Sequence, residues 1–154
     1  MAYLADQILR LAFDSTRSDG AGDIALVGLG GTGRGEMAPY SDVDILFLVP
    51  PDGHSDCAGR IEATLYLLWQ LDWTIGHAVR DAAEILRLAA EDVTVRTAFS
   101  ESRWIWGEQG LFDEAWDQFR RTFVGGHAKA FVNAKMAERD ERHRRMGDSR
   151  YLVE

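Results

Sequence analysis

The chain has 154 residues, of which 46% are hydrophobic and 27% charged, and it carries a formal net charge of −8. This length suits one globular domain, and the composition excludes a disordered or fibrous protein. The negative charge argues against nucleic acid as a partner, because a broad surface of this sign would repel the phosphate backbone.

The apolar residues predict alternating helices and strands in the first half of the chain. In chain order, the predicted elements are a helix at 3–13, strands at 23–29 and 43–49, a helix at 56–71 and a strand at 73–79. Beyond Asp81 the pattern is helical almost to the end, with breaks at glycines, and the aromatic residues from Trp104 to Phe123 fall at broadly helical intervals. We therefore expect an α/β (α+β) fold with a small mixed sheet flanked by helices and a helical C-terminal half.

The predicted organisation is one domain over 1–154, with an α/β core at 1–80 and a helical part at 81–154. Because the chain ends at Glu154 without an evident stop signal, we expect a fragment of a longer multidomain protein. No apolar run approaches the roughly 18 residues that a membrane helix needs, and the N-terminus lacks the layout of a secretory signal. We therefore expect a cytoplasmic protein with no membrane partner. The single Cys57 excludes an internal disulfide.

The segment Ala25–Pro50 reads ALVGLGGTGRGEMAPYSDVDILFLVP, in which a predicted strand runs into five glycines and two acids then open the next strand. Side chains alternate across a strand, so Asp42 and Asp44 point to the same face. Two such carboxylates can share two Mg²⁺ ions, which stabilise a phosphate under attack. The sequence therefore predicts Asp42 and Asp44 as catalytic metal ligands for Mg²⁺, with Mn²⁺ as a substitute.

The glycines next to this pair predict a site for a nucleoside triphosphate. Gly30, Gly31 and Gly33 have no Cβ, so backbone N–H groups can approach phosphate oxygens closely and form an anion-binding nest. Arg34 lies close enough to add a charged donor. Ser41, which directly precedes the acid pair, completes the predicted nucleotide-binding set.

A dinucleotide-binding site is the alternative, because Gly28, Gly30 and Gly33 also match the pattern G-x-G-x-x-G. In that fold a full helix follows the glycines, and an acid ends the second strand about 20 residues further on. Here only eight residues, Arg34 to Ser41, separate the last glycine from the first acid, and both acids precede the apolar run. The spacing argues against an NAD-type site.

The order Leu29-Gly30-Gly31, ten intervening residues, then Asp42-Val43-Asp44-Ile45 resembles the nucleotidyltransferase superfamily of DNA polymerase β and kanamycin nucleotidyltransferase. The string GGTGRGEMAPYSDVDILFL looks like the N-terminal domain of bacterial PII uridylyltransferase/uridylyl-removing enzymes, whose loop typically reads GGYGRGE followed by SDxD. The resemblance continues through LYLLWQLDWTIGHAVRD, EDVTVRTAFSESRWIWGE and AERDERHRRMGDSRY, so it covers most of the chain. One position departs from the pattern, since Thr32 stands where the family usually has Tyr.

The resemblance implies that the protein transfers UMP from UTP to a tyrosine of the PII nitrogen-signalling protein and releases pyrophosphate, while a separate HD domain reverses the reaction. Carried over by position, it implies that Gly30 and Gly31 contact the triphosphate and that Asp42 and Asp44 bind Mg²⁺. These motifs do not fix the base, so another nucleoside triphosphate stays open. Two other hypotheses remain, a non-catalytic nucleotide-sensing or partner-docking module and a nucleotidyltransferase that acts on a small molecule.

Many members of the superfamily place a third carboxylate on a later strand, but the predicted strand at 73–79 contains His77 and no acid. Asp72 and Asp81 flank it, and the choice between them, or a site with two acids, stays open. His77 fits local hydrogen bonding as well as a site role. None of the four histidines is followed by Asp, and the sequence shows no clustered His/Asp set outside the acid pair, so we expect no uridylyl-removing activity.

Overall fold

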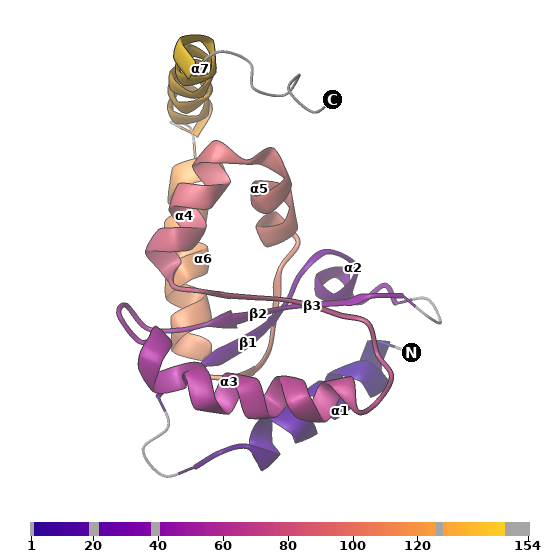
Figure 1. Cartoon of the computed structure of the whole chain (residues 1–154). Helices are drawn as coiled ribbons and strands as arrows, with labels where there is room; N and C mark the ends of the chain where they lie inside the picture. Colours follow the sequence, from indigo (N-terminus) through magenta and orange to yellow (C-terminus); the bar gives the residue numbers. More distant parts are fainter. Residues whose placement is uncertain (1, 19–21, 38–40, 126–127, 147–154) are drawn as a thin grey trace.

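The computed structural model describes residues 2–18, 22–37, 41–125 and 128–146, and Figure 1 shows a sheet with helices on both faces. The elements are α1 (Ala2–Ser15), β1 (Ala25–Gly28), α2 (Gly30–Arg34), β2 (Val43–Leu48), α3 (His54–Trp69), β3 (Ile75–Arg80), α4 (Ala82–Glu91), α5 (Val93–Ser100), β4 (Arg103–Gly107), α6 (Gln109–Phe123) and α7 (Ala128–Met146). This mixture of helices and strands confirms the predicted fold class. Residues 19–21, between α1 and β1, lie outside the described residues.

The strands form one mixed sheet in the order β3-β2-β1-β4. β1 pairs in antiparallel orientation with both β2 and β4, and β2 pairs in parallel with β3. A dinucleotide-binding fold instead joins its first strands in parallel through a helix. The antiparallel pairing of β1 with β2 therefore excludes that fold, as the spacing of the glycines and acids predicts.

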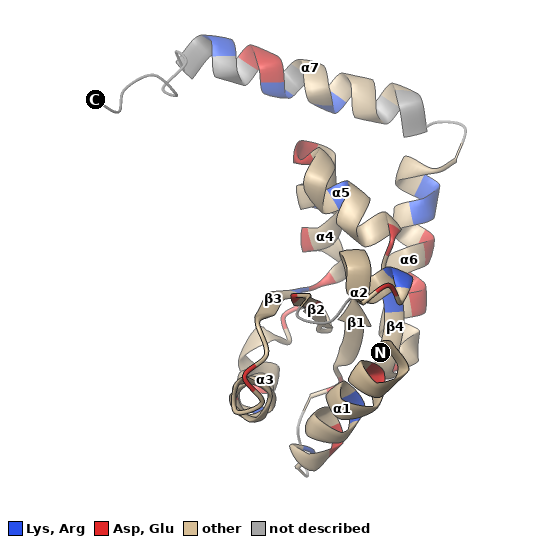
Figure 2. Ribbon diagram, turned by 90° about the vertical axis from the view of Figure 1, so that its right-hand side faces the viewer, with Lys and Arg blue, Asp and Glu red and all other residues tan. Residues whose placement is uncertain are grey.

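Helices bury the two central strands from both sides. On one face α1 and α3 pack on the sheet, and the rings of Phe13 and Phe47 lie 6.5 Å apart between centroids. On the other face Leu46 and Leu48 share a core with Phe119 of α6. Figure 2 shows these two helical layers on opposite sides of the sheet, with α7 beyond the upper layer. No helix among the described residues is long and apolar enough to cross a bilayer.

The strand β4 lies where the sequence predicts helix. Its residues Trp104 and Trp106 pair with β1, across a shift of register. The helical spacing of the aromatic residues holds only for the part within α6. The C-terminal half is helical as expected except at β4, because this strand is defined by a partner far away in the sequence and not by its own pattern.

Candidate active site

The backbone of Asp44 is tied to the glycine-rich segment before it. Its N–H donates to Oγ1 of Thr32 at 3.1 Å, and its carbonyl oxygen accepts from the N–H of Leu29 at 2.9 Å. The side chain of Asp44 is exposed, on the sheet face that α4 and α6 cover, whereas the four residues that follow it in β2 are buried. The fold thus holds Asp44 at the start of β2 with its carboxylate accessible.

The Asp44 carboxylate lies between two glycines. A Cβ at Gly30 would lie 3.9 Å from Oδ2 of Asp44, and a Cβ at Gly76 would overlap Oδ1. Gly76 stands beside Asp44 in the parallel register of β2 and β3. Gly30 has a φ of +51°, which residues with a side chain rarely adopt. Neither wall of this slot carries a side chain, so the carboxylate lies directly against the glycine backbone at Gly76 and faces Gly30 across a wider gap.

Asp42 supplies the second carboxylate at the same end of β2. It lies one residue before the strand and is exposed, as is Asp44. Carboxylate oxygens are the hard donors that Mg²⁺ prefers. Two exposed carboxylates beside a slot without side chains fit a divalent cation that also binds phosphate oxygens.

The glycine segment forms the short helix α2. Gly30 and Gly31 begin this helix, and the first N–H groups of a helix have no acceptor within it. Gly33 has another role. Its N–H donates to the carbonyl of Leu29 at 3.0 Å, and a Cβ at Gly33 would overlap the carbonyl oxygen of Glu101. The structure therefore leaves Gly30 as the glycine of α2 that faces Asp44, while Gly33 lets α2 pack against the segment after α5.

The guanidinium of Arg34 is held by two acids. Its Nε donates to Glu36 at 2.8 Å and its Nη1 to Glu101 at 2.5 Å. The hydrogen bond with Glu36 and the nearby charge of Glu101 raise the pKa of Arg34 above its ordinary value. Ser41 is exposed just before Asp42, beside residues 38–40, which lie outside the described part of the chain.

Arg103, at the start of β4, supports α2 and is not among the residues predicted from sequence. Its guanidinium donates to the carbonyl oxygens of Thr32 and Gly33 at 3.1 Å each, and to the carboxylate of Asp6 on α1 at 2.9 and 3.1 Å. Carbonyls at the C-terminal end of a helix attract cations. Arg103 reaches them because β4 pairs with β1, so only the prediction of β4 would have indicated this contact.

Neither candidate for a third carboxylate stands beside Asp44. Asp81 follows β3 at the far end of the sheet, where Arg80 pairs with Leu48, four residues along β2 from Asp44 at roughly 3.3 Å per residue. Asp72 is exposed before β3, with a φ of 54°. Within the described part of β3, the position next to Asp44 is glycine.

His77 lies on the other face of the sheet from Asp44. The register pairs it with Ile45, whose side chain belongs to the core under α1 and α3. Its ring contacts that of Trp69 on α3, with centroids 6.2 Å apart. The structure thus places His77 away from Asp44 and in a ring contact with Trp69, which counts against a site role.

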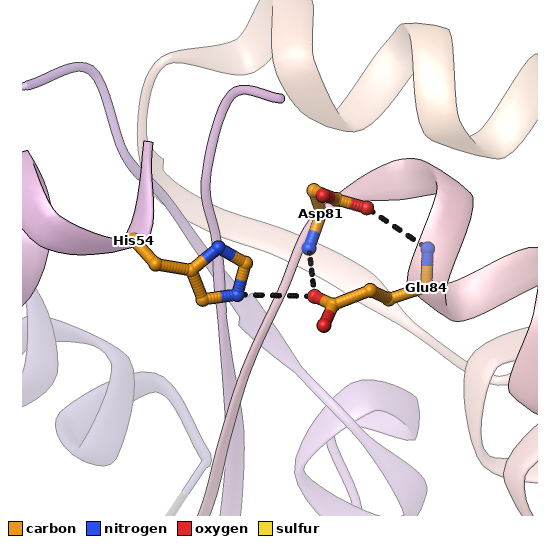
Figure 3. Close-up of side chains that lie close together, drawn as sticks. All are labelled: His54, Asp81 and Glu84. Carbon is orange, nitrogen blue, oxygen red and sulfur yellow. Dashed lines mark hydrogen bonds and ion pairs between the residues drawn. The ribbon is translucent and has the colours of Figure 1, made fainter. Parts of the chain in front are cut away.

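His54, Asp81 and Glu84 form a second cluster of potential metal ligands, where α3 and α4 begin (Figure 3). The expectation that no clustered His/Asp set exists outside the acid pair is therefore wrong. Asp81 Oδ1 accepts from the N–H of Glu84 at 2.9 Å, and Glu84 Oε2 accepts from the N–H of Asp81 at 2.9 Å and lies 3.0 Å from His54 Nε2. The two hydrogen bonds between Asp81 and Glu84 form a capping box. Capping therefore accounts for the two carboxylates of the cluster, and His54 adds a contact with Glu84.

A cavity of about 690 Å³ lies at the other end of β1 from Asp44, beside Ile24 and Gly107. The guanidinium of Arg60, which lines it, stacks 3.8 Å from the ring centroid of Phe13, and burial lowers the pKa of Arg60. This cavity contains neither carboxylate of the acid pair, so its size does not mark the active site.

The sequence matches an established family and a set of curated proteins. Residues 9–105 match the family described as nucleotidyltransferase domain. The chain is 48% identical over 162 residues to a bifunctional uridylyltransferase/uridylyl-removing enzyme of Novosphingobium aromaticivorans, covering 99% of this chain and 18% of that protein. Proteins with the same description from Erythrobacter litoralis and Rhodospirillum rubrum are each 44% identical over 99% of this chain and cover 18% and 17% of their own lengths.

A crystal structure of a toxin–antitoxin with AMP-PNP is similar to this chain with a TM-score of 0.48 and 16% identity, over 82% of this chain and 97% of that one. The chain spans less than a fifth of the length of the curated relatives named above. The family match includes the segment that carries Gly30, Asp42 and Asp44. The chain belongs to the nucleotidyltransferase family of enzymes.

Proposed function

We propose that the protein transfers UMP from UTP to a tyrosine hydroxyl of the PII signalling protein and releases pyrophosphate. One observation carries the proposal, which is the exposed Asp44 carboxylate beside Gly30, on a backbone that is held at the start of β2. The description of the relatives as uridylyltransferases supports UTP as the donor. The choice of PII rests on the resemblance of the loop and acid pair to that family, and we place the reaction in the cytoplasm.

In this proposal Asp42 and Asp44 hold Mg²⁺, or Mn²⁺ in its place, through their carboxylate oxygens. Such ions stabilise the charge that develops on the α-phosphate and on the leaving pyrophosphate. Gly30 and Gly31 offer N–H groups to the triphosphate, which approaches closely because neither residue has a side chain. The tyrosine oxygen attacks the α-phosphorus in line, its proton passes to a carboxylate or to water, and the bond to pyrophosphate breaks.

In this proposal Arg34 donates to phosphate through Nη2 of its guanidinium. Its Nε and Nη1 donate to Glu36 and Glu101, which leaves this third nitrogen to an anion. Ser41 lies at the exposed edge of the same site. Gly33 contributes indirectly, by allowing α2 to pack where Gly30 faces Asp44.

A non-catalytic nucleotide-binding module is the second candidate. It is favoured by the glycine that stands beside Asp44 on β3, where many members of the superfamily place a third acid. Such a module would use the same glycines and acids to bind a triphosphate with its metal, but it would transfer nothing to a protein.

Transfer of label from UTP marked at the α-phosphate to purified PII separates these candidates. The proposal expects labelled PII in the presence of Mg²⁺ and none when the acceptor tyrosine of PII is replaced by Phe. Both this chain and a longer protein that contains it are assayed. UTP binding without label on PII in either protein would support the module, and parallel titrations with ATP, CTP and GTP identify the preferred base.

A further inference from the structure

We infer that Gly76 is a positioning residue of the active site, because its missing side chain sets the direction of the Asp44 carboxylate and thereby the affinity for the metal. The inference rests on the proposed function in one respect, namely that Asp44 binds a divalent cation. Neither the glycine segment nor the acid pair indicates a role for Gly76. This residue lies on β3 and joins the site only through the parallel pairing with β2.

The space around Gly76 requires glycine, whereas its backbone does not. The φ of Gly76 lies outside the left-handed region, which among the described glycines holds only Gly30, Gly35 and Gly107. A Cβ on Gly76 would overlap Oδ1 of Asp44 and lie 3.5 Å from its Cγ. Glycine within a strand weakens it and often marks a close approach of another group. Here that group is the Asp44 carboxylate.

A side chain at position 76 would displace the Asp44 carboxylate and leave the strands in place. The backbone of Asp44 is held by Thr32 and Leu29, and the strand is paired on both sides. The carboxylate oxygen is the free end of an exposed side chain, so it turns away while the strand stays in place. Its other oxygen then leaves its position facing Gly30, which separates the metal ligand from the glycine segment.

The effect on metal binding is expected to be large. Residues that orient a metal ligand without touching the metal typically change its affinity by about 10- to 100-fold. We therefore expect Gly76→Ala to weaken Mn²⁺ binding by about that factor while the temperature of unfolding stays within a few degrees of wild type.

The test is a titration of the protein with Mn²⁺, followed by electron paramagnetic resonance of the free ion, for wild type, Gly76→Ala, Asp44→Asn and the double variant. Gly59→Ala is the matched control, because a Cβ at Gly59 on α3 meets open space. We expect Gly59→Ala to bind as wild type does. We expect Gly76→Ala to bind weakly, and to add nothing to the loss that Asp44→Asn causes on its own.

The outcomes separate this inference from the proposed function. If Asp44→Asn binds Mn²⁺ as wild type does, the metal assignment behind the proposed function fails. If Asp44→Asn loses the ion and a folded Gly76→Ala keeps wild-type affinity, only the inference about Gly76 fails. Should Gly76→Ala unfold, Asp44→Ala/Gly76→Ala removes the overlapping carboxylate and is expected to fold as Asp44→Ala does. Unfolding of that double variant would show that Gly76 serves the sheet and would overturn the inference.

Discussion

The hydroxyl oxygen of Thr32 accepts a hydrogen bond from the backbone N–H of Asp44, with 3.1 Å between oxygen and nitrogen. Thr32 is 1% exposed, so this bond lies inside the contact between α2 and β2. The family usually has Tyr at this position. In this chain the departure has a local role, because the threonine hydroxyl ties the glycine segment to the strand that carries the proposed metal ligand.

We expect Thr32→Val to destabilise the protein by about 1–3 kcal/mol, because a part-buried N–H loses its partner while the shape of the side chain is nearly kept. Thr32→Ser keeps the hydroxyl and is expected to retain more of the free energy of unfolding. Urea denaturation of the two variants measures the difference. Equal midpoints for Val and Ser would show that the hydrogen bond contributes nothing.

Asp42→Asn and Asp44→Asn are each expected to abolish UMP transfer while the fold stays intact. Both carboxylates are exposed, and removal of one charge relieves repulsion between them, so the unfolding temperature should hold or rise. Asp113→Asn, at an exposed position on α6, is the control and should keep full activity. Full transfer by either variant would show that the replaced carboxylate is not an essential metal ligand.

Gly31→Val is expected to weaken UTP binding by at least about tenfold, or 1.4 kcal/mol, because a branched side chain would fill the approach to the backbone N–H groups. Gly31→Ala tests the size dependence. Its Cβ would lie 3.2 Å from the carbonyl oxygen of Glu36, which asks only for a small adjustment. Calorimetric titration with UTP and Mg²⁺ is the measurement. Wild-type affinity in a folded Val variant would refute the proposed contact between the glycine N–H groups and the triphosphate.

We expect this polypeptide to release no UMP from PII-UMP, because none of its histidines begins a His-Asp doublet. The assay contains Mg²⁺ or Mn²⁺ and excludes pyrophosphate, so that reversal of transfer cannot contribute. Because His54, Asp81 and Glu84 form a cluster of potential metal ligands, His54→Gln is the control variant. Hydrolysis that survives Asp42→Asn but disappears in His54→Gln would mean that this cluster is a second metal centre and not a helix cap.

The local part of the site could be predicted from sequence, and the part made by distant segments could not. Gly30, Asp42 and Asp44 lie within one stretch, where strand alternation alone indicates a shared face. Gly76 and Arg103 join the site through pairings of β3 and β4, which depend on register across the sheet. A short edge strand between helices has little periodicity of its own, so β4 could not be predicted from the local sequence pattern.

The dependence on strand pairing also explains why the sequence did not predict the cluster around His54. His54 is far from Asp81 and Glu84 in the sequence and meets them because β2 and β3 run parallel, so the helices that follow these strands begin side by side. Motif spacing identifies ligands that lie close together in the sequence. It does not identify residues that strand pairing brings together. Asp81 alone carries a local signal, since Glu84 stands three residues later and completes the capping box.

The sheet order gives β1 two neighbours that leave the ribosome at very different times. β2 follows β1 after the glycine segment, whereas β4 follows only after α4 and α5. Until residue 107 has been synthesised, one side of β1 keeps open hydrogen-bonding groups, and an open strand edge recruits strands of other chains. We therefore expect a nascent chain without β4 to expose this edge of β1 until β4 pairs with it and Arg103 contacts α2.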